Sequence, residues 1–400
     1  MKIYRYPSAA AHKKVQAIAA RTIDFRKTDV QTVTRILNHV KRSGDSALVE
    51  YSRQFDAPGM KRDDLTVTDE EMATASKQVE RGFMRALNRA ATNIERFHRQ
   101  QLPKSWIDTR RSGTLLGQMV HPVDAAGVYV PGGKGGRTPL VSSVLMGAIP
   151  ARIAGVPRVV MVTPPMSSGA VAPHLLVAAK KAGVDAVYKV GSAWAIAALA
   201  YGTATIPKVN VIVGPGNIFV TLAKKMVAGT VGIDMIAGPS EILVIADRTA
   251  EAEFTAADLL SQAEHDPLAS AVLVTDSADL AQAVLAAVQR QVARLDRVDV
   301  ARASLSAYGA IMVVDSLQTA VDLANRFAPE HLELQVADPM AIMPSIRNAG
   351  AIFLGHYTPE PVGDYMAGPN HVLPTAGTAR FSSALSVEHF MKKTSLVGYT

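Results

Sequence analysis

The strongest constraint on the fold is an alternation of short β-branched runs with Ala- and Leu-rich helical stretches, which begins after the first hundred or so residues. The runs predicted as strands are 159–162, 186–190, 209–213, 242–245, 271–274 and 310–314. Strands that alternate with helices form parallel sheets flanked by helices. The sequence therefore predicts an α/β protein of Rossmann-like type, preceded by a mostly helical N-terminal region with one long helix over about 69–101.

Two breaks, near 125–127 and near 238–240, divide this alternating region, and the segment between them has strands and helices of its own. We interpret it as one incomplete Rossmann-like domain inserted into another. The predicted parts are an N-terminal arm (1–20), a discontinuous α/β domain (21–126 with 241–385), an inserted domain (127–240) and the start of a C-terminal tail (386–400).

Composition excludes several classes of function. The 400 residues are 48% apolar and contain no cysteine, so disulfides, thiolate metal sites and a cysteine nucleophile are excluded. The N-terminus lacks an apolar signal core, and Pro150 and Arg152 interrupt the most apolar stretch. The net charge of +7 lies mainly on helices of the N-terminal region, where a solvated face explains it. We expect a cytoplasmic protein that binds neither membrane nor nucleic acid.

A long stretch without helical or strand periodicity runs from 358 to 386 and is rich in proline and glycine. It also carries Glu360, Asp364, His371 and Arg380 among apolar residues. A long irregular segment inside a compact domain is usually either functional or disordered. This composition favours an ordered loop that forms part of a site.

The predicted helix 251–265 places Gln262 and His265 three residues apart and so on one face. An imidazole and an amide oxygen there can both reach one cation, although a histidine at a helix C-terminus is also favoured by the helix dipole. Because sulfur is absent, a zinc site would need nitrogen and oxygen donors. A carboxylate from the 358–386 loop would complete such a set.

Glu330 and His331 are adjacent, after Pro329 and before a predicted strand. A carboxylate beside an imidazole at a strand entrance suits general acid–base chemistry, whereas a solvated turn is the simpler alternative. The dinucleotide fingerprint G-x-G-x-x-G is absent. The glycine turns 131–139 and 214–217 follow strands and can admit a phosphate, but tight turns explain them equally well.

Taken together, these segments resemble the histidinol dehydrogenase family. The resemblance covers about residues 20–393 and is specific, because several long motifs occur in one chain. The matching stretches are RSGDSALVEYSRQFD (42–56), GVYVPGG (127–133), SSVLMGAIPARIAGV (142–156), GPGNIFV (214–220), IDMIAGPSEILVIAD (233–247), DLLSQAEHD (258–266), FAPEHLE (327–333) and most of 355–393.

The resemblance implies oxidation of L-histidinol to L-histidine in two NAD-linked steps through an aldehyde, by a homodimer with one zinc ion per site. It implies zinc ligands Gln262, His265 and Asp364, and an acid–base pair of Glu330 and His331. Gln262, His265, Asp364 and His331 would also contact the substrate, as would Ser240 and His371. Contacts to NAD are implied for Tyr129 and Asn217, and for position 194.

The absence of cysteine fits this chemistry, because an activated water must then attack the aldehyde in place of a thiolate. We assign His331 as the base for the alcohol and hydrate protons, and Glu330 as the residue that activates the water. Zinc would hold the imidazole and amine of the substrate.

The chain departs from the family pattern at three places. The family continues beyond the position of Thr400 into a tail with an EGL-x-x-H motif, whose histidine completes the zinc site of the partner subunit. Trp194 stands where the family has a glutamine that contacts NAD, and the 131–139 turn is longer than usual. These departures keep two alternatives open: a paralogous dehydrogenase of another small polar alcohol, and a degenerate homologue without turnover.

Overall fold

The structure is a computed structural model that describes residues 1–21, 25–132 and 139–400. The chain forms two compact units, each described here by itself. Unit 1 comprises Met1–Asp24, Ala237–Gly363 and Leu373–Ala384, and unit 2 comprises Phe25–Ile236, Asp364–Val372 and Leu385–Thr400. Within the described ranges, no helix has the length and apolar character needed to cross a membrane.

Unit 1 is built on a parallel sheet in which the described strands follow the order β1-β11-β10-β9-β12-β13. Their bounds are Ile3–Arg5, Ala310–Val313, Ser270–Thr275, Glu241–Ala246, His331–Gln335 and Ala351–Leu354 in that order. The parallel sheet confirms the fold class predicted from the alternating pattern. The three predicted strands of this unit, β9, β10 and β11, lie side by side.

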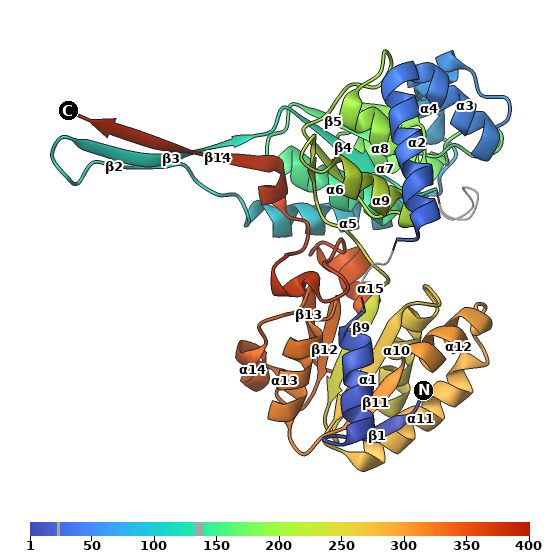
Figure 1. Ribbon diagram of the computed structural model, residues 1–400, viewed down its shortest axis with the longest axis vertical. Helices are drawn as coiled ribbons and strands as arrows, with labels where there is room; N and C mark the ends of the chain where they lie inside the picture. The colour runs from blue at the N-terminus through green and yellow to red at the C-terminus, as the bar shows by residue number, and fades with distance from the viewer. Residues whose placement is uncertain (22–24, 133–138) are drawn as a thin grey trace. The chain divides into compact units, whose positions relative to one another are not determined.

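Helices cover both faces of this sheet (Figure 1). One layer holds α10 (Ala252–Ala263), α11 (Ala278–Val292) and α12 (Val298–Ala307), and the other holds α1 (Ala9–Ala19) and α13 (Leu317–Phe327). Side chains alternate along a strand, so Ile242 and Val244 pack in the first core and Leu243 and Ile245 in the second. Two packed faces explain why these strands are almost entirely apolar.

Unit 2 contains a second parallel sheet, in the order β6-β5-β4-β7-β8. The bounds are Ala186–Lys189, Arg158–Thr163, Ala125–Tyr129, Val211–Val213 and Gly232–Ile233. One core contains residues of α5 (Arg81–Arg99), α6 (Val141–Ile153) and α7 (Pro173–Lys181). The core on the other face contains residues of α2 (Lys27–Ser43), α3 (Asp45–Phe55), α8 (Ser192–Tyr201) and α9 (Ile218–Val227).

The single helix expected over 69–101 is in fact two helices, α4 (Asp69–Ala75) and α5. Turn hydrogen bonds end α4, because the backbone N–H of Lys77 donates to Thr74 and that of Gln78 to Ala75. Residue 80 then begins α5. The amphipathic pattern was read correctly as helical, but it does not show this interruption.

Unit 2 also has an antiparallel sheet of β2 (Trp106–Asp108), β3 (Thr114–Pro122) and β14 (Met391–Tyr399). Figure 1 shows these strands extending away from the helices of their own unit. The segment expected as the start of a tail is therefore mostly a strand, which pairs with β3 along its whole length. We call this three-stranded sheet the β-arm.

The two units do not follow the domain boundaries expected from the sequence. Residues 25–126 group with the sheet of unit 2, because α2 packs against α8 and α9, and α5 packs against α6. The first twenty residues are part of unit 1, where β1 pairs with β11 and α1 packs against α13. The 358–386 loop contributes its two ends to unit 1 and its middle to unit 2.

Candidate active site

A row of buried polar side chains lies along β12 in unit 1. His331, Glu333 and Gln335 alternate with Leu332 and Leu334, and the two leucines pack in the core shared with α1 and α13. The three polar side chains therefore face the layer that contains α10. None of the three is more than 2% exposed. Such a row needs a specific set of partners, because a buried polar group without a hydrogen bond is costly.

The backbone of Glu241 organises the predicted acid–base pair. Its carbonyl lies 3.1 Å from Nδ1 of His331, and its N–H donates to Oε2 of Glu330 at 2.9 Å. Because a carbonyl only accepts, Nδ1 carries a proton, which leaves Nε2 as the nitrogen that can act as a base. Oε2 of Glu330 also lies 3.7 Å from Nδ1 of His331. The structure thus brings the two residues together in a buried site, with the imidazole in one tautomer.

Glu360 belongs to this site, although the sequence pattern predicts no role for it beyond membership of the loop. It is the first residue of α15 (Glu360–Val362) and is 3% exposed. A carboxylate oxygen lies within 4.8 Å of a ring nitrogen of His331, and Oε2 accepts a hydrogen bond from Ser261 on α10 at 3.3 Å. A carboxylate beside an imidazole can hold a metal ion. A glutamate between two prolines was a weak signal, because spacing does not show burial.

A hydrogen-bonded network of two acids and an amide contacts the backbone of Glu360. Nε2 of Gln335 donates to Asp258 and to Glu333, at 2.8 Å in both cases, and Oε1 of Glu333 accepts from the backbone N–H of Glu360 at 3.2 Å. Burial and the adjacent carboxylate of Asp258 hold the pKa of Glu333 well above its ordinary value. Burial also raises the pKa of Asp258. A proton therefore remains on this pair, which lets two acids share an apolar interior.

Gln262 and His265, the predicted metal ligands of unit 1, lie at the end of α10. Gln262 is 1% exposed, and among the described residues its Oε1 has no hydrogen-bond partner. His265 is exposed, and its Nδ1 lies 3.0 Å from the carbonyl of Ser261, which leaves Nε2 as the ligand nitrogen. An orphaned buried amide oxygen beside such a histidine fits a cation site. His265 is not part of the group formed by His331 and Glu360.

The remaining predicted substrate and metal residues are divided between the units. Ser240 precedes β9 in unit 1, and its carbonyl accepts from the N–H of Ser270 at 3.0 Å. Asp364 and His371 are half-buried and belong to unit 2. Asp364 lies four residues after Glu360, in the helical turn Gly363–Ala367 that directly follows α15.

The predicted cofactor contacts lie at the carboxyl ends of strands in unit 2. Tyr129 ends β4 and is 4% exposed, and its hydroxyl accepts from the N–H of Ser192, the first residue of α8, at 3.2 Å. Burial raises the pKa of Tyr129, so the phenol stays neutral. Asn217 follows β7, and its Oδ1 caps α9 by accepting from Phe219 and Val220 at 3.1 and 3.2 Å.

The strand order reverses at this edge, because β5 and β6 lie on one side of β4 and β7 and β8 on the other. Ligands of such sheets bind at the carboxyl ends of the strands where the order reverses. Gly214 follows β7 with φ of 116°, and a Cβ there would lie 2.1 Å from the carbonyl oxygen of Tyr129. Close packing against β4 therefore accounts for this glycine. Residues 133–138 of the other predicted turn lie outside the described residues.

Trp194 forms part of an aromatic stack in unit 2. Its ring lies 5.5 Å from that of Tyr51 and 5.6 Å from that of Phe55, with interplanar angles of 23° and 22°. The side chain is 4% exposed, and its indole N–H has no hydrogen-bond partner among the described residues. The stack makes Trp194 a packing residue.

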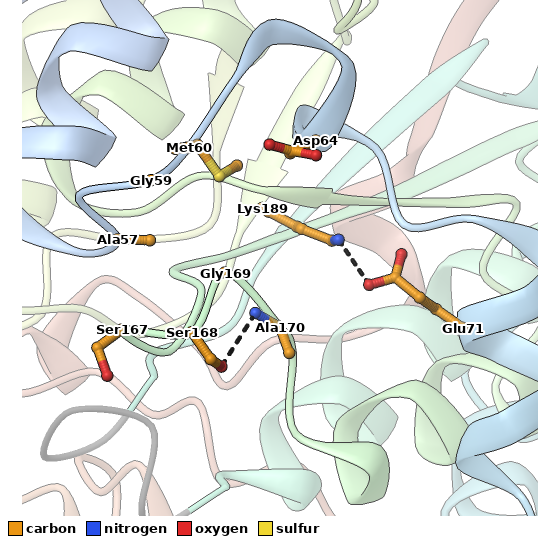
Figure 2. Close-up of a pocket in the computed structure, with 10 residues that line it drawn as sticks. All are labelled: Ala57, Gly59, Met60, Asp64, Glu71, Ser167, Ser168, Gly169, Ala170 and Lys189. Atoms are coloured by element: carbon orange, nitrogen blue, oxygen red, sulfur yellow. Dashed lines mark hydrogen bonds and ion pairs between the residues drawn. The ribbon is translucent and has the colours of Figure 1, made fainter.

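Unit 2 also contains a polar cavity of about 290 Å³ at the ends of β5 and β6. Figure 2 shows the ammonium of Lys189 turned toward the carboxylate of Glu71, with the Ser167–Ala170 turn beside them. The ion pair measures 2.6 Å, and the second carboxylate oxygen accepts from the N–H of Thr68 at 2.8 Å. Each charge is thus already matched within the protein.

Comparison with known proteins places this arrangement in an enzyme family. Residues 20–400 match the family model of histidinol dehydrogenase. The histidinol dehydrogenase of Desulfotalea psychrophila is 56% identical over 368 residues, which are 92% of this chain and 85% of that protein. The histidinol dehydrogenase of a Synechococcus species is 53% identical over 393 residues, which are 98% of this chain and 90% of that protein.

Solved structures agree. The crystal structure of histidinol dehydrogenase from Elizabethkingia anophelis matches with a TM-score of 0.93 at 36% identity, over 100% of this chain and 90% of that one. A probable aldehyde dehydrogenase from Listeria monocytogenes has a TM-score of 0.51 at 11% identity, over 98% of this chain and 95% of that one, and shares the fold alone.

Two helix-flanked parallel sheets, with a buried carboxylate and imidazole side by side at the entrance of one strand, fit an α/β oxidoreductase. The chain belongs to the histidinol dehydrogenase family, as the resemblance predicted. That membership supports oxidation of histidinol, within histidine biosynthesis, as its activity.

Proposed function

We propose that the protein oxidises L-histidinol to L-histidine in the cytoplasm, through the aldehyde and with two molecules of NAD. The observation that carries this proposal is the buried pair of Glu330 and His331, held by the backbone N–H and carbonyl of Glu241 so that Nε2 of His331 is the basic nitrogen. The absence of cysteine from the sequence supports water, rather than a thiolate, as the nucleophile of the second step.

In the first step, Nε2 of His331 would take the hydroxyl proton of the substrate and later release it to solvent. Glu330 would take a proton from the water that adds to the aldehyde carbon. In the second step the deprotonated His331 would take the proton of the hydrate hydroxyl. NAD, when bound, would supply the hydride acceptor for each of the two oxidations. The sum converts one alcohol, one water and two NAD⁺ into one carboxylate, two NADH and three protons.

Gln262, His265 and Asp364 are the residues that we propose hold a zinc ion. When bound, zinc would supply a positive charge that orients the imidazole and amine of the substrate. The orphaned Oε1 of Gln262 and the Nδ1 hydrogen bond of His265 support this assignment. For NAD we propose the carboxyl edge of the unit 2 sheet, around Tyr129 and Asn217, with Trp194 behind it.

We further propose that the protein is a homodimer and that the β-arm takes part in the subunit contact. Large apolar side chains stand exposed on the arm, among them Trp106 at 53%, Ile107 at 59%, Val397 at 71% and Tyr399 at 67%. An exposed apolar patch of this kind is typical of an interaction surface. Sedimentation of the chain and of a Val397→Ser variant tests this, and an unchanged mass would remove the arm from the contact.

The decisive experiment measures NADH formed from a limiting amount of L-histidinol, with added zinc and with a chelator. We expect two NADH for each histidinol consumed, and a loss of activity with the chelator that zinc restores. One NADH for each substrate would contradict the two-step reaction. If another small polar alcohol is oxidised and histidinol is not, the substrate assignment is wrong.

A further inference from the structure

Arg21 is a buried cation at the end of the N-terminal segment of unit 1, outside the set of proposed catalytic residues. Its side chain is 9% exposed, and its guanidinium lies 4.7 Å from the ring centre of Tyr308. The same guanidinium donates to the carbonyl of Leu268 and pairs with the carboxylate of Glu241, at 3.3 Å between nitrogen and oxygen. Three separate parts of unit 1 thus fix its position.

The partner, Glu241, is the residue whose backbone holds the acid–base pair. Its N–H donates to Glu330 and its carbonyl lies at Nδ1 of His331, while its side chain, 9% exposed, reaches Arg21. Glu241 is also the first residue of β9, so its strand pairing fixes only one side of this peptide. The contact with Arg21 restrains the residue from the side-chain end.

We propose that Arg21 is a positioning residue for the reaction, which acts by fixing Glu241 so that its backbone holds Glu330 and His331 in their working geometry. The proposal rests on the function proposed above, because it needs the acid–base roles of those two residues. Arg21 would act on the pair chiefly through Glu241, and its charge also interacts with the carboxylate of Glu330.

A purely structural role predicts something different. Removal of a buried ion pair that only supports the fold would lower the stability of the protein. It would leave kcat and KM of the folded fraction unchanged. Here one residue supplies the side chain of the pair and both backbone contacts, so a shift of Glu241 misaligns the base and the water-activating carboxylate together. Residues that orient catalytic groups in this way typically change activity by about 10- to 100-fold.

The test uses Arg21→Met, Glu241→Gln and the double variant, with kcat and KM for L-histidinol measured on protein whose circular dichroism is native. We expect kcat to fall about 10- to 100-fold in each single variant, with KM within about twofold. The double variant should lose no more than the worse single one, because both break the same contact. The proposal is overturned if the losses of kcat in the two single variants multiply in the double variant. It is also overturned if folded Arg21→Met keeps the wild-type kcat.

Two further variants keep the test informative if Arg21→Met does not fold. Arg21→Lys retains the charge but loses the planar fork, so we expect a folded protein with an intermediate fall in kcat. Arg290→Met is the matched control, because it breaks an ion pair with Glu253 whose side chains are 57% and 56% exposed. An Arg21→Lys variant that behaves like Arg290→Met overturns the proposal.

Guanidinium added to an Arg21→Ala variant gives a readout that loss of folding does not explain. We expect a saturable recovery of kcat, and no recovery in a Glu330→Gln variant. Recovery in neither would count against the positioning role. If the wild-type chain turns over no histidinol, the proposed function fails and this inference fails with it, whereas a wild-type rate in folded Arg21 variants removes the inference alone.

Discussion

The two parallel sheets have the same kind of topology but differ in what their strands bury. In unit 1, β12 carries His331, Glu333 and Gln335 into the interior, where a network of hydrogen bonds satisfies them. In unit 2, β4 reads Ala-Ala-Gly-Val-Tyr, and Tyr129 at its carboxyl end is the one polar side chain on it. Similar scaffolds therefore bury a polar network along β12 in unit 1 and an almost wholly apolar strand, β4, in unit 2.

This difference predicts that substitutions in unit 1 and in unit 2 affect the protein in different ways. In unit 1, substitutions on β12 and on the peptide of Glu241 should change rates through the position and charge of reacting groups. In unit 2, substitution of Trp194, which is 4% exposed and stacked between Tyr51 and Phe55, should act mainly through packing. Substitutions of Glu330, Trp194 and Asp56 test this prediction.

Glu330→Gln should have the largest effect. The amide oxygen can still accept from the N–H of Glu241, so the fold is kept, but the side chain no longer takes a proton from water. We expect oxidation of the aldehyde to slow about 100-fold or more, and oxidation of the alcohol much less. Stopped-flow assays started from histidinol and from the aldehyde measure the two steps. Equal slowing would contradict the separate roles of Glu330 and His331.

Trp194→Ala should destabilise the core of unit 2. Removing the ring from between Tyr51 and Phe55 should cost about 3 to 5 kcal/mol of unfolding free energy. Urea unfolding followed by circular dichroism measures it, since Trp194 is one of only two tryptophans available for fluorescence. Trp194→Phe is the control and should lose less. A change in the ratio of the two oxidation rates would instead give Trp194 a role in the chemistry.

The sequence alone predicted the parallel α/β fold, because β-branched runs and helical stretches alternate visibly. It also predicted Glu330 and His331 as a pair, because they are adjacent in the chain. It missed the rest of the polar row, since Glu333 and Gln335 look like an exposed strand face until α10 is seen to cover them. Period-two polarity over residues 331–335 was the signal that was available.

Long-range packing explains the other failures. The apolar stripe of α2 shows that the helix packs on something, but not that its partner is α8 rather than the sheet of unit 1. The burial of Glu360 likewise depends on Ser261 and Glu333, which are about a hundred and about thirty residues away in sequence. Local pattern specifies the elements, and contacts between distant segments specify which of them meet.

Asp56 in unit 2 offers the smallest test, and it probes the cost of partly burying an acid there. Burial raises the pKa of its carboxyl to about 6 from the usual 3.8, and its Oδ2 has no hydrogen-bond partner among the described residues. Below about pH 3, the folded and unfolded forms are both largely protonated and folding has no such cost. As pH rises from about 3 to 6 the unfolded form ionises first, so stability falls, and the loss persists above pH 6.

Asp56→Asn removes this penalty, so the variant should exceed the wild type in stability at pH 8 by about 1 to 2 kcal/mol, after allowance for partial solvent screening. Near pH 3 the two should be nearly equal. Urea unfolding at both pH values measures the difference, with Asp276→Asn as an exposed control that should show none. A gain of the same size at both pH values would mean that Asp56 is not penalised for its charge, and that unit 2 accommodates an acid as readily as unit 1 does.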